Sequence, residues 1–92
     1  MDIQHQDDGH NGRFYIETNH TPIAELTYVW SGNTAFTIDH TFVDDSLRGQ
    51  GVAKHLLDAA VAFARRKDAR IVPLCSYARV MFERDPAYRD VI

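Results

Sequence analysis

The stretch VDDSLRGQGVAKHLLDAAVAFARR, residues 43–66, decides the fold of this chain. Before it, apolar and polar residues alternate, whereas within it apolar residues recur every three or four positions, which predicts a helix. The helix stripe consists of Val52, Leu56, Ala59 and Phe63, widened by Leu57, Ala60 and Ala64. An arginine and two glycines stand directly before this helix. Glycines at such a junction either form a tight turn or let backbone N–H groups close around an anion.

Upstream of the helix, three segments alternate as strands do. They cover residues 13–18, 22–30 and 34–43 and are joined by the turn-prone NHTP and SGN. We expect an antiparallel meander. Strict alternation in the third segment predicts that Asp39 points away from the face that carries Phe36, Ile38, His40 and Phe42, so that Asp39 and His40 do not share a site.

Downstream of the helix, residues 69–75 read as a short buried strand and residues 76–84 as a second helix, ended by Asp85-Pro86. The element order is therefore β-β-β-α-β-α, which predicts an α/β fold with a small mixed sheet. The strand, long helix and strand around the glycine turn form a right-handed crossover that joins parallel strands. Pro73 removes a backbone donor, so we expect this parallel pair to splay where the glycine turn begins.

Composition limits the class of protein. Ninety-two residues with 45% hydrophobic content are sufficient for one domain with one core, which we place at residues 13–92. A formal charge of −3 argues against a nucleic-acid partner, and no apolar run approaches the roughly 18–20 residues that span a bilayer. The single cysteine excludes an internal disulfide. We expect a cytoplasmic protein that is a monomer or a homodimer.

Residues 1–12 are polar and acidic and read as a flexible N-terminal tail. Four of them have metal-binding side chains: His5, Asp7, Asp8 and His10. A solvated tail is the better interpretation, because nothing in the sequence fixes the geometry that a metal site needs. We therefore predict no metal.

The glycine turn has the chemistry of an anion site. The first N–H groups of a helix are unpaired and lie at the positive end of its dipole, and Arg48 adds a guanidinium that pairs with phosphate oxygens. The spacing fits neither a Walker A loop nor the dinucleotide fingerprint. A plain strand-to-helix turn is the alternative. A splayed strand pair that ends at an anion-binding turn suits a ligand with a long amide arm and a pyrophosphate, and coenzyme A is such a ligand.

Arg48-Gly49-Gln50-Gly51-Val52-Ala53 resembles the (Gln/Arg)-x-x-Gly-x-(Gly/Ala) motif of the GNAT superfamily of N-acetyltransferases. From HTFVDDSLRGQGVAKHLL to VPLCSYARVMFERDPAYRDV the chain is similar to the short single-domain branch of that family, and the resemblance covers about residues 13–91. It implies a minimal GNAT-type fold that binds acetyl-CoA, with Val43 beside the pantetheine arm. The implied pyrophosphate contacts are the backbone groups of Arg48, Gly49, Gln50, Gly51, Val52 and Ala53.

The resemblance leaves the catalytic residues open. Phe82 stands where relatives carry a general-acid tyrosine, and phenylalanine has no proton to donate. Cys75 falls beside the cofactor's arm at the start of a helix, a position that is expected to suit a thiol for relaying an acetyl group. The alternative for Cys75 is a small buried hydrophobic residue.

Three further side chains are candidates. His40 is either a general base for the amine, or for Cys75, or a hydrogen-bonded core histidine. Tyr77 and Tyr88 are possible replacements for the missing acid, although tyrosines beside a core usually pack and donate one hydrogen bond. The acceptor does not follow from the resemblance, because this sequence lacks the helices and terminal strands that wall the acceptor pocket in larger relatives.

These observations favour an N-acetyltransferase that uses acetyl-CoA as acyl donor and transfers the acetyl group to an amine. The acceptor is a small molecule or a protein lysine, and transfer is direct or passes through Cys75. The alternative is a non-catalytic module that binds acyl-CoA or another protein, which the missing tyrosine favours. A third interpretation, a turn that binds some other phosphate ligand, requires the family resemblance to mislead.

Overall fold

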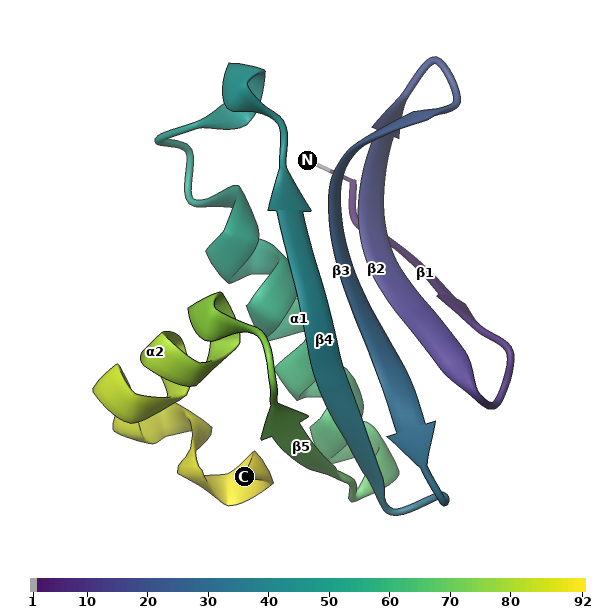
Figure 1. Cartoon of the computed structure of the whole chain (residues 1–92), viewed down its shortest axis with the longest axis vertical. Helices are drawn as coiled ribbons and strands as arrows, with labels where there is room; N and C mark the ends of the chain where they lie inside the picture. The colour runs from purple at the N-terminus through teal and green to yellow at the C-terminus, as the bar shows by residue number, and fades with distance from the viewer. Residues whose placement is uncertain (1) are drawn as a thin grey trace.

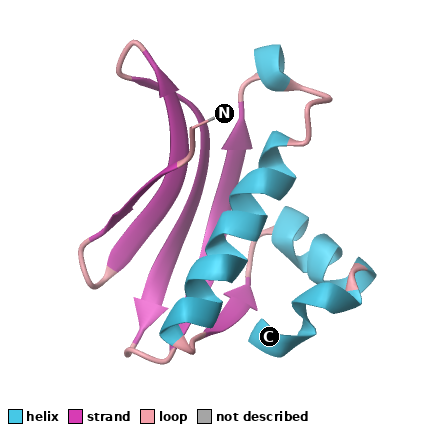
Figure 2. Ribbon diagram, turned by 180° about the vertical axis from the view of Figure 1, so that it is seen from behind, coloured by secondary structure: helices cyan, strands magenta, loops and turns pink. Residues whose placement is uncertain are grey.

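The computed structural model describes residues 2–92, which form one five-stranded mixed sheet with a long helix on one face (Figures 1 and 2). The strands lie in chain order across the sheet, the first four antiparallel and the last parallel to the fourth. Their bounds are β1 Gln4–Asp7, β2 Asn11–Thr18, β3 Thr21–Ser31, β4 Ala35–Val43 and β5 Arg70–Pro73.

Two α-helices follow the predicted positions. Helix α1, Val52–Lys67, packs its apolar stripe against β2, β3 and β4, and helix α2, Ser76–Arg84, lies beside it (Figure 2). The mixed α/β class and the order of the predicted elements are confirmed. The sequence analysis missed two 3₁₀ turns, η1 at Asp45–Leu47 and η2 at Pro86–Val91, which are too short to show a period.

The prediction of a flexible tail over residues 1–12 is wrong for the residues that form β1. This strand was missed because its sequence, QHQD, is polar and its residues are exposed. It is held by long-range contacts: the His5 ring stacks on Phe14 at 4.1 Å, and His5 Nε2 lies 2.6 Å from Tyr28 Oη. Tyr28 Oη and Trp30 Nε1 both donate to Asp7 Oδ2, at 2.6 and 2.8 Å. His5 and Asp7 thus anchor an edge strand.

Tyr28 is the centre of an aromatic core between the sheet and α1. It is 1% exposed, and its ring lies 4.7 Å from that of Phe36 and 5.9 Å from that of Phe63 on α1. Its ring also passes directly over Gly12, its cross-strand partner on β2. A Cβ built on Gly12 would stand 2.1 Å from Tyr28 Cζ, so only glycine fits under this ring. Among residues 2–92, no helix is long and apolar enough to cross a membrane.

The strict alternation predicted for residues 34–43 is wrong, because β4 contains a bulge at Asp39. Ile38 pairs with Tyr28 and His40 pairs with Thr27, which leaves Asp39 as the extra residue. Phe36 and Ile38 face the core, as predicted, but His40 and Phe42 fall on the other face of the sheet. Phe42 is accordingly 43% exposed. Beyond the bulge, Thr41 and Val43 turn toward the core, opposite Leu26 and Ala24.

The parallel strands part at Pro73, but Pro73 pairs with Ile38, so they separate before the end of β4 and not, as predicted, where the glycine turn begins. The register of β4 with β5 runs from Ala35–Arg70 to Ile38–Pro73 and stops there. The Ile38 carbonyl accepts the N–H groups of both Leu74 and Cys75, each at 3.0 Å. Strand β4 continues to Val43 without a β5 partner, while the chain after β5 turns into α2 (Figure 1).

We predict that Gly12→Ala lowers the free energy of unfolding by about 1–3 kcal/mol, because the new methyl group forces the locked Tyr28 ring to move. Urea unfolding measures this change. Asn11→Ala, at an exposed neighbouring position on β2, is the control and is expected to have a smaller effect. Equal stability of Gly12→Ala and the wild type would contradict the close packing described above.

We also predict that His5 makes the protein less stable in mild acid. Although His5 is exposed overall, the aromatic rings that pack against its imidazole partly desolvate it and so lower its pKa from the ordinary value of 6.5; the charge of Asp7 opposes this shift and that of Arg66 reinforces it. The unfolded chain therefore binds this proton more readily, and the contribution of neutral His5 is complete above about pH 6.5 and is lost as pH falls below it. Urea unfolding at pH 7 and pH 5 should show a weaker pH dependence for His5→Gln than for the wild type. The exposed His20 provides the control His20→Gln, and an identical slope in His5→Gln and the wild type would refute the prediction.

Candidate functional site

A groove of about 290 Å³ lies where β4 has left β5 and the glycine turn enters α1. It is lined by the end of β4, by the turn, by the first residues of α1 and by the start of α2. The lining residues are Val43, Leu47, Arg48, Gly49, Gly51, Val52, Ala53, Lys54 and Tyr77. Of the seven residues predicted to contact the cofactor, all but Gln50 are in this set. The structure therefore brings the predicted cofactor-binding residues together around one hollow.

The glycine turn leaves the start of α1 open to a ligand. Gly49 and Gly51 have φ values of 83° and 70°, the left-handed region that glycine adopts without strain. Gly51 is the N-cap of α1, and no side chain caps the helix. The Gly51 carbonyl accepts from His55 N at 3.1 Å, so the N–H groups of Val52, Ala53 and Lys54 have no acceptor within the helix. This arrangement suits an anion, since the donors lie at the positive end of the helix dipole.

Arg48, the side-chain cation that the sequence predicts for phosphate binding, forms an ion pair outside helix α1. Its Nη2 lies 2.6 Å from Asp45 Oδ1 on η1, and the two side chains are 80% and 87% exposed. The turn η1 is itself capped by Asp44, whose carboxylate accepts from the backbone N–H and the hydroxyl of Ser46. Arg48 lines the groove but points its guanidinium toward η1.

Tyr77, on the first turn of α2, is the predicted catalytic residue that lines the groove. Burial raises the pKa of its phenol, and the nearby ammonium of Lys54 partly offsets this effect. The phenol therefore carries its proton at neutral pH and is able to donate it or a hydrogen bond. Tyr77 stands within the electrostatic reach of Lys54, Asp58 and Cys75.

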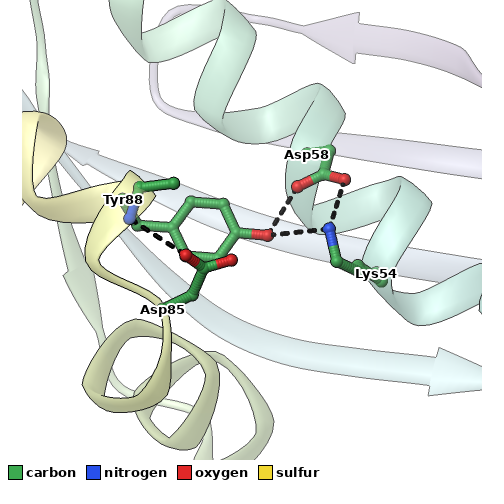
Figure 3. Close-up of polar contacts among 5 residues, drawn as sticks. Lys54, Asp58, Asp85 and Tyr88 are labelled. Atoms are coloured by element: carbon green, nitrogen blue, oxygen red, sulfur yellow. Dashed lines mark hydrogen bonds and ion pairs between the residues drawn. The ribbon is translucent and has the colours of Figure 1, made fainter.

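The sequence analysis missed a polar cluster that joins α1 to η2 (Figure 3). Lys54 Nζ donates to Asp58 Oδ2 at 3.0 Å and to Tyr88 Oη at 3.4 Å, and Tyr88 Oη donates to Asp58 Oδ1 at 2.6 Å. Burial, followed by the hydrogen bond to Asp58, raises the pKa of the Tyr88 phenol. The spacing of Lys54 and Asp58 gave a weak signal for this cluster, but the third partner lies thirty residues beyond Asp58 in the chain.

Cys75 sits at the point where the strands part. Its N–H donates to the Ile38 carbonyl, and its side chain is the N-cap of α2, with Sγ accepting from Ala78 N at 3.4 Å. The side chain is half-buried and packs against the core. Cys75 precedes Tyr77 by two residues but is not among the residues that line the groove.

Phe82 does not reach the groove. It is 5% exposed and packs in the core, with its ring 5.2 Å from that of Tyr88. Tyr88, the other candidate for the missing acid, already donates a hydrogen bond from its hydroxyl to Asp58. Tyr77 is therefore the phenol that the structure leaves available at the groove.

His40 lies apart from these groups. The bulge places it with Asp39 on the outer face of the sheet, where Thr27 Oγ1 donates to Asp39 Oδ1 at 2.6 Å. The expectation that Asp39 points away from His40 is wrong for the same reason. Asp39 lines a second hollow of about 640 Å³ on this face, together with residues of β1, β2 and β3. Cys75 packs on the core side, so the structure does not bring His40 and Cys75 together.

A sequence profile of the GCN5-related N-acetyltransferase family matches residues 13–91. The chain therefore belongs to this family, and its members are acetyltransferases. The family match covers the β4 end, the glycine turn and both helices that form the groove.

Solved structures support this assignment. A GCN5-like protein from Staphylococcus aureus is 41% identical, with a TM-score of 0.77 over 98% of this chain and 85% of that one. An aminoglycoside N-acetyltransferase in complex with CoA shares the fold at a TM-score of 0.64, with 15% identity over 99% of this chain and 90% of that one.

The chain is also similar in sequence to protein NATD1 of Bos taurus, with 36% identity over 63 residues, 68% of this chain. That alignment covers 56% of the bovine protein, so this chain matches little more than half of that relative's length.

Proposed function

We propose that this chain is an N-acetyltransferase that binds acetyl-CoA along the groove and transfers the acetyl group to an amine. Two features that meet at one place carry the proposal: the end of β4, which has no partner on its β5 side, and the uncapped N–H groups of α1. The first offers backbone groups to an amide-rich arm, and the second offers donors to a pyrophosphate. The family match adds support, because the matched residues include both features.

The residues of the groove fit this ligand in detail. Glycine at positions 49 and 51 leaves the space above the turn free, since a Cβ at either position would meet no atom within 4 Å. Val43 faces the groove from β4 because of the bulge, beside the position expected for the pantetheine arm. Acetyl-CoA supplies an activated thioester, so the protein's main task is to hold the amine against its carbonyl carbon.

In direct transfer, the neutral amine attacks the thioester carbonyl carbon and the C–S bond breaks. Tyr77 lines the groove and is the proposed donor of a proton to the leaving thiolate. Solvent takes the proton that the amine loses, or His40 does if the amine approaches from the outer face of the sheet. In the relay, the Cys75 thiolate attacks first and releases CoA, and the amine then attacks the acetyl-cysteine.

The second candidate function, a module that binds acyl-CoA without catalysis, is favoured by the burial of Phe82 in the core. We propose a cytoplasmic location, as the composition suggests.

Intact-protein mass spectrometry after incubation with acetyl-CoA tests these alternatives. We expect a non-covalent complex in native spectra of the wild type and of Cys75→Ala. A covalent acetyl adduct that disappears in Cys75→Ala would identify the relay, whereas a complex without an adduct would leave direct transfer or simple binding. A catalyst must also release CoA faster than the blank when a suitable amine is added. The absence of any complex in both proteins would overturn the proposal.

We predict that Gly51→Ala weakens CoA binding by about tenfold, because the methyl group and the strained left-handed backbone disturb the anion site. Isothermal titration calorimetry measures the affinity. Gly32→Ala is the matched control: Gly32 has a φ of 67° with no atom near the new Cβ, but lies in the turn between β3 and β4. Both variants should lose about 1 kcal/mol of stability, and only Gly51→Ala should lose affinity.

A further inference from the structure

Lys54 is the groove residue whose side chain is best fixed by its neighbours, and the inference drawn from it rests on the proposed function. It occupies the third position of α1 and lines the groove beside Gly51 and Tyr77. Its ammonium reaches Asp58 one turn further along α1 and Tyr88 on η2 (Figure 3). The side chain is 51% exposed, so its ammonium group is bonded to Asp58 and Tyr88 and is still accessible to a ligand.

Lys54 has more hydrogen-bond donors than its two protein partners use. A lysine ammonium has three N–H donors, and Lys54 uses two of them on Asp58 Oδ2 and Tyr88 Oη. The hydrogen bond to Asp58 also raises the pKa of Lys54, so the group is charged. One donor remains for a ligand in the groove. By contrast, Arg48 pairs with Asp45 on the far side of the turn, and both side chains are almost fully exposed.

The position of the ammonium depends on the chain's C-terminal segment. Tyr88 is 4% exposed and packs against Phe82, so its hydroxyl is fixed. Arg65 fastens the same segment to α1: it donates to both carboxylate oxygens of Asp90, at 2.8 and 2.9 Å, and to the Ala87 carbonyl at 2.8 Å. Lys54 is thus held by two partners from two elements, which restricts an otherwise flexible side chain.

We propose that Lys54 is the side-chain cation that binds a phosphate group of the CoA ligand, and that Asp58 and Tyr88 are positioning residues for it. The third donor of Lys54 then adds to the three uncapped N–H groups of α1, whose residues line the same groove. Because Asp58 balances the charge of Lys54, the lysine contributes a directed donor more than net positive charge. Arg48, in this arrangement, serves mainly to close the turn onto η1.

Calorimetric titration of CoA into the full chain tests the proposal. Lys54→Gln should weaken binding by about tenfold, because it removes a charge-assisted hydrogen bond, and the loss should be larger at low salt. Lys54→Arg should recover most of the affinity, since a guanidinium keeps the charge and the donors. Lys67→Gln, which removes the same charge at the other end of α1, is the matched control and should bind as the wild type does.

Parallel titrations with 3′-dephospho-CoA identify the phosphate. If Lys54→Gln weakens both ligands equally, Lys54 contacts the pyrophosphate; if the loss disappears with 3′-dephospho-CoA, it contacts the 3′-phosphate. Both results support the proposal. If Lys54→Gln binds CoA as tightly as the wild type, the proposal is wrong and the proposed function stands. If the wild type itself does not bind CoA, both fail.

Tyr88→Phe tests the positioning role without changing charge. It keeps the packing against Phe82 and removes the hydroxyl that Lys54 and Asp58 share. We expect a loss of affinity of about threefold, smaller than that of Lys54→Gln, with little further loss when the two substitutions are combined. Thermal unfolding of each variant separates this effect from a general loss of structure. Fully additive losses would show that Tyr88 does not act through Lys54.

Discussion

The end of the parallel pairing between β4 and β5 is the constraint on which the site depends. The register of β4 with β5 ends at Ile38 and Pro73, where the Ile38 carbonyl accepts the N–H groups of both Leu74 and Cys75. From that point β4 is paired with β3 alone, the glycine turn carries the chain back into α1, and α2 begins where β5 stops. The early end of the pairing with β5 therefore creates the opening and leaves the N-terminus of α1 at its rim.

The bulge at Asp39 has a second, less visible effect. By shifting the alternation by one residue, it turns Val43 toward the groove and moves His40 and Phe42 to the outer face. A regular strand would have placed His40 on the core side and Val43 away from the groove. The bulge thus separates the side of the groove, with Tyr77 and Lys54, from an outer face that carries Asp39 and His40. The proposed chemistry requires both sides to meet at the opening between the strands.

Periodicity and local chemistry were sufficient to predict most of the architecture. The change of period at the glycine turn, the strand at residues 69–75 and the stop at Asp85-Pro86 all correspond to elements of the fold. Local patterns could not reveal β1, because its polar residues owe their order to Tyr28 and Trp30 on another strand. Nor could they reveal the bulge, which depends on how β4 registers with β3.

The sequence by itself determined the class of fold, the family and the set of residues around the glycine turn. Each of these depends on contacts between residues near in sequence, or on motifs read directly from the chain. Tertiary structure alone decided which side chains face that turn: Arg48 is drawn to Asp45, whereas Lys54 is held at the groove by Asp58 and Tyr88. The reason is that Tyr88 reaches Lys54 only after η2 has packed against α1, a contact between segments thirty-four residues apart.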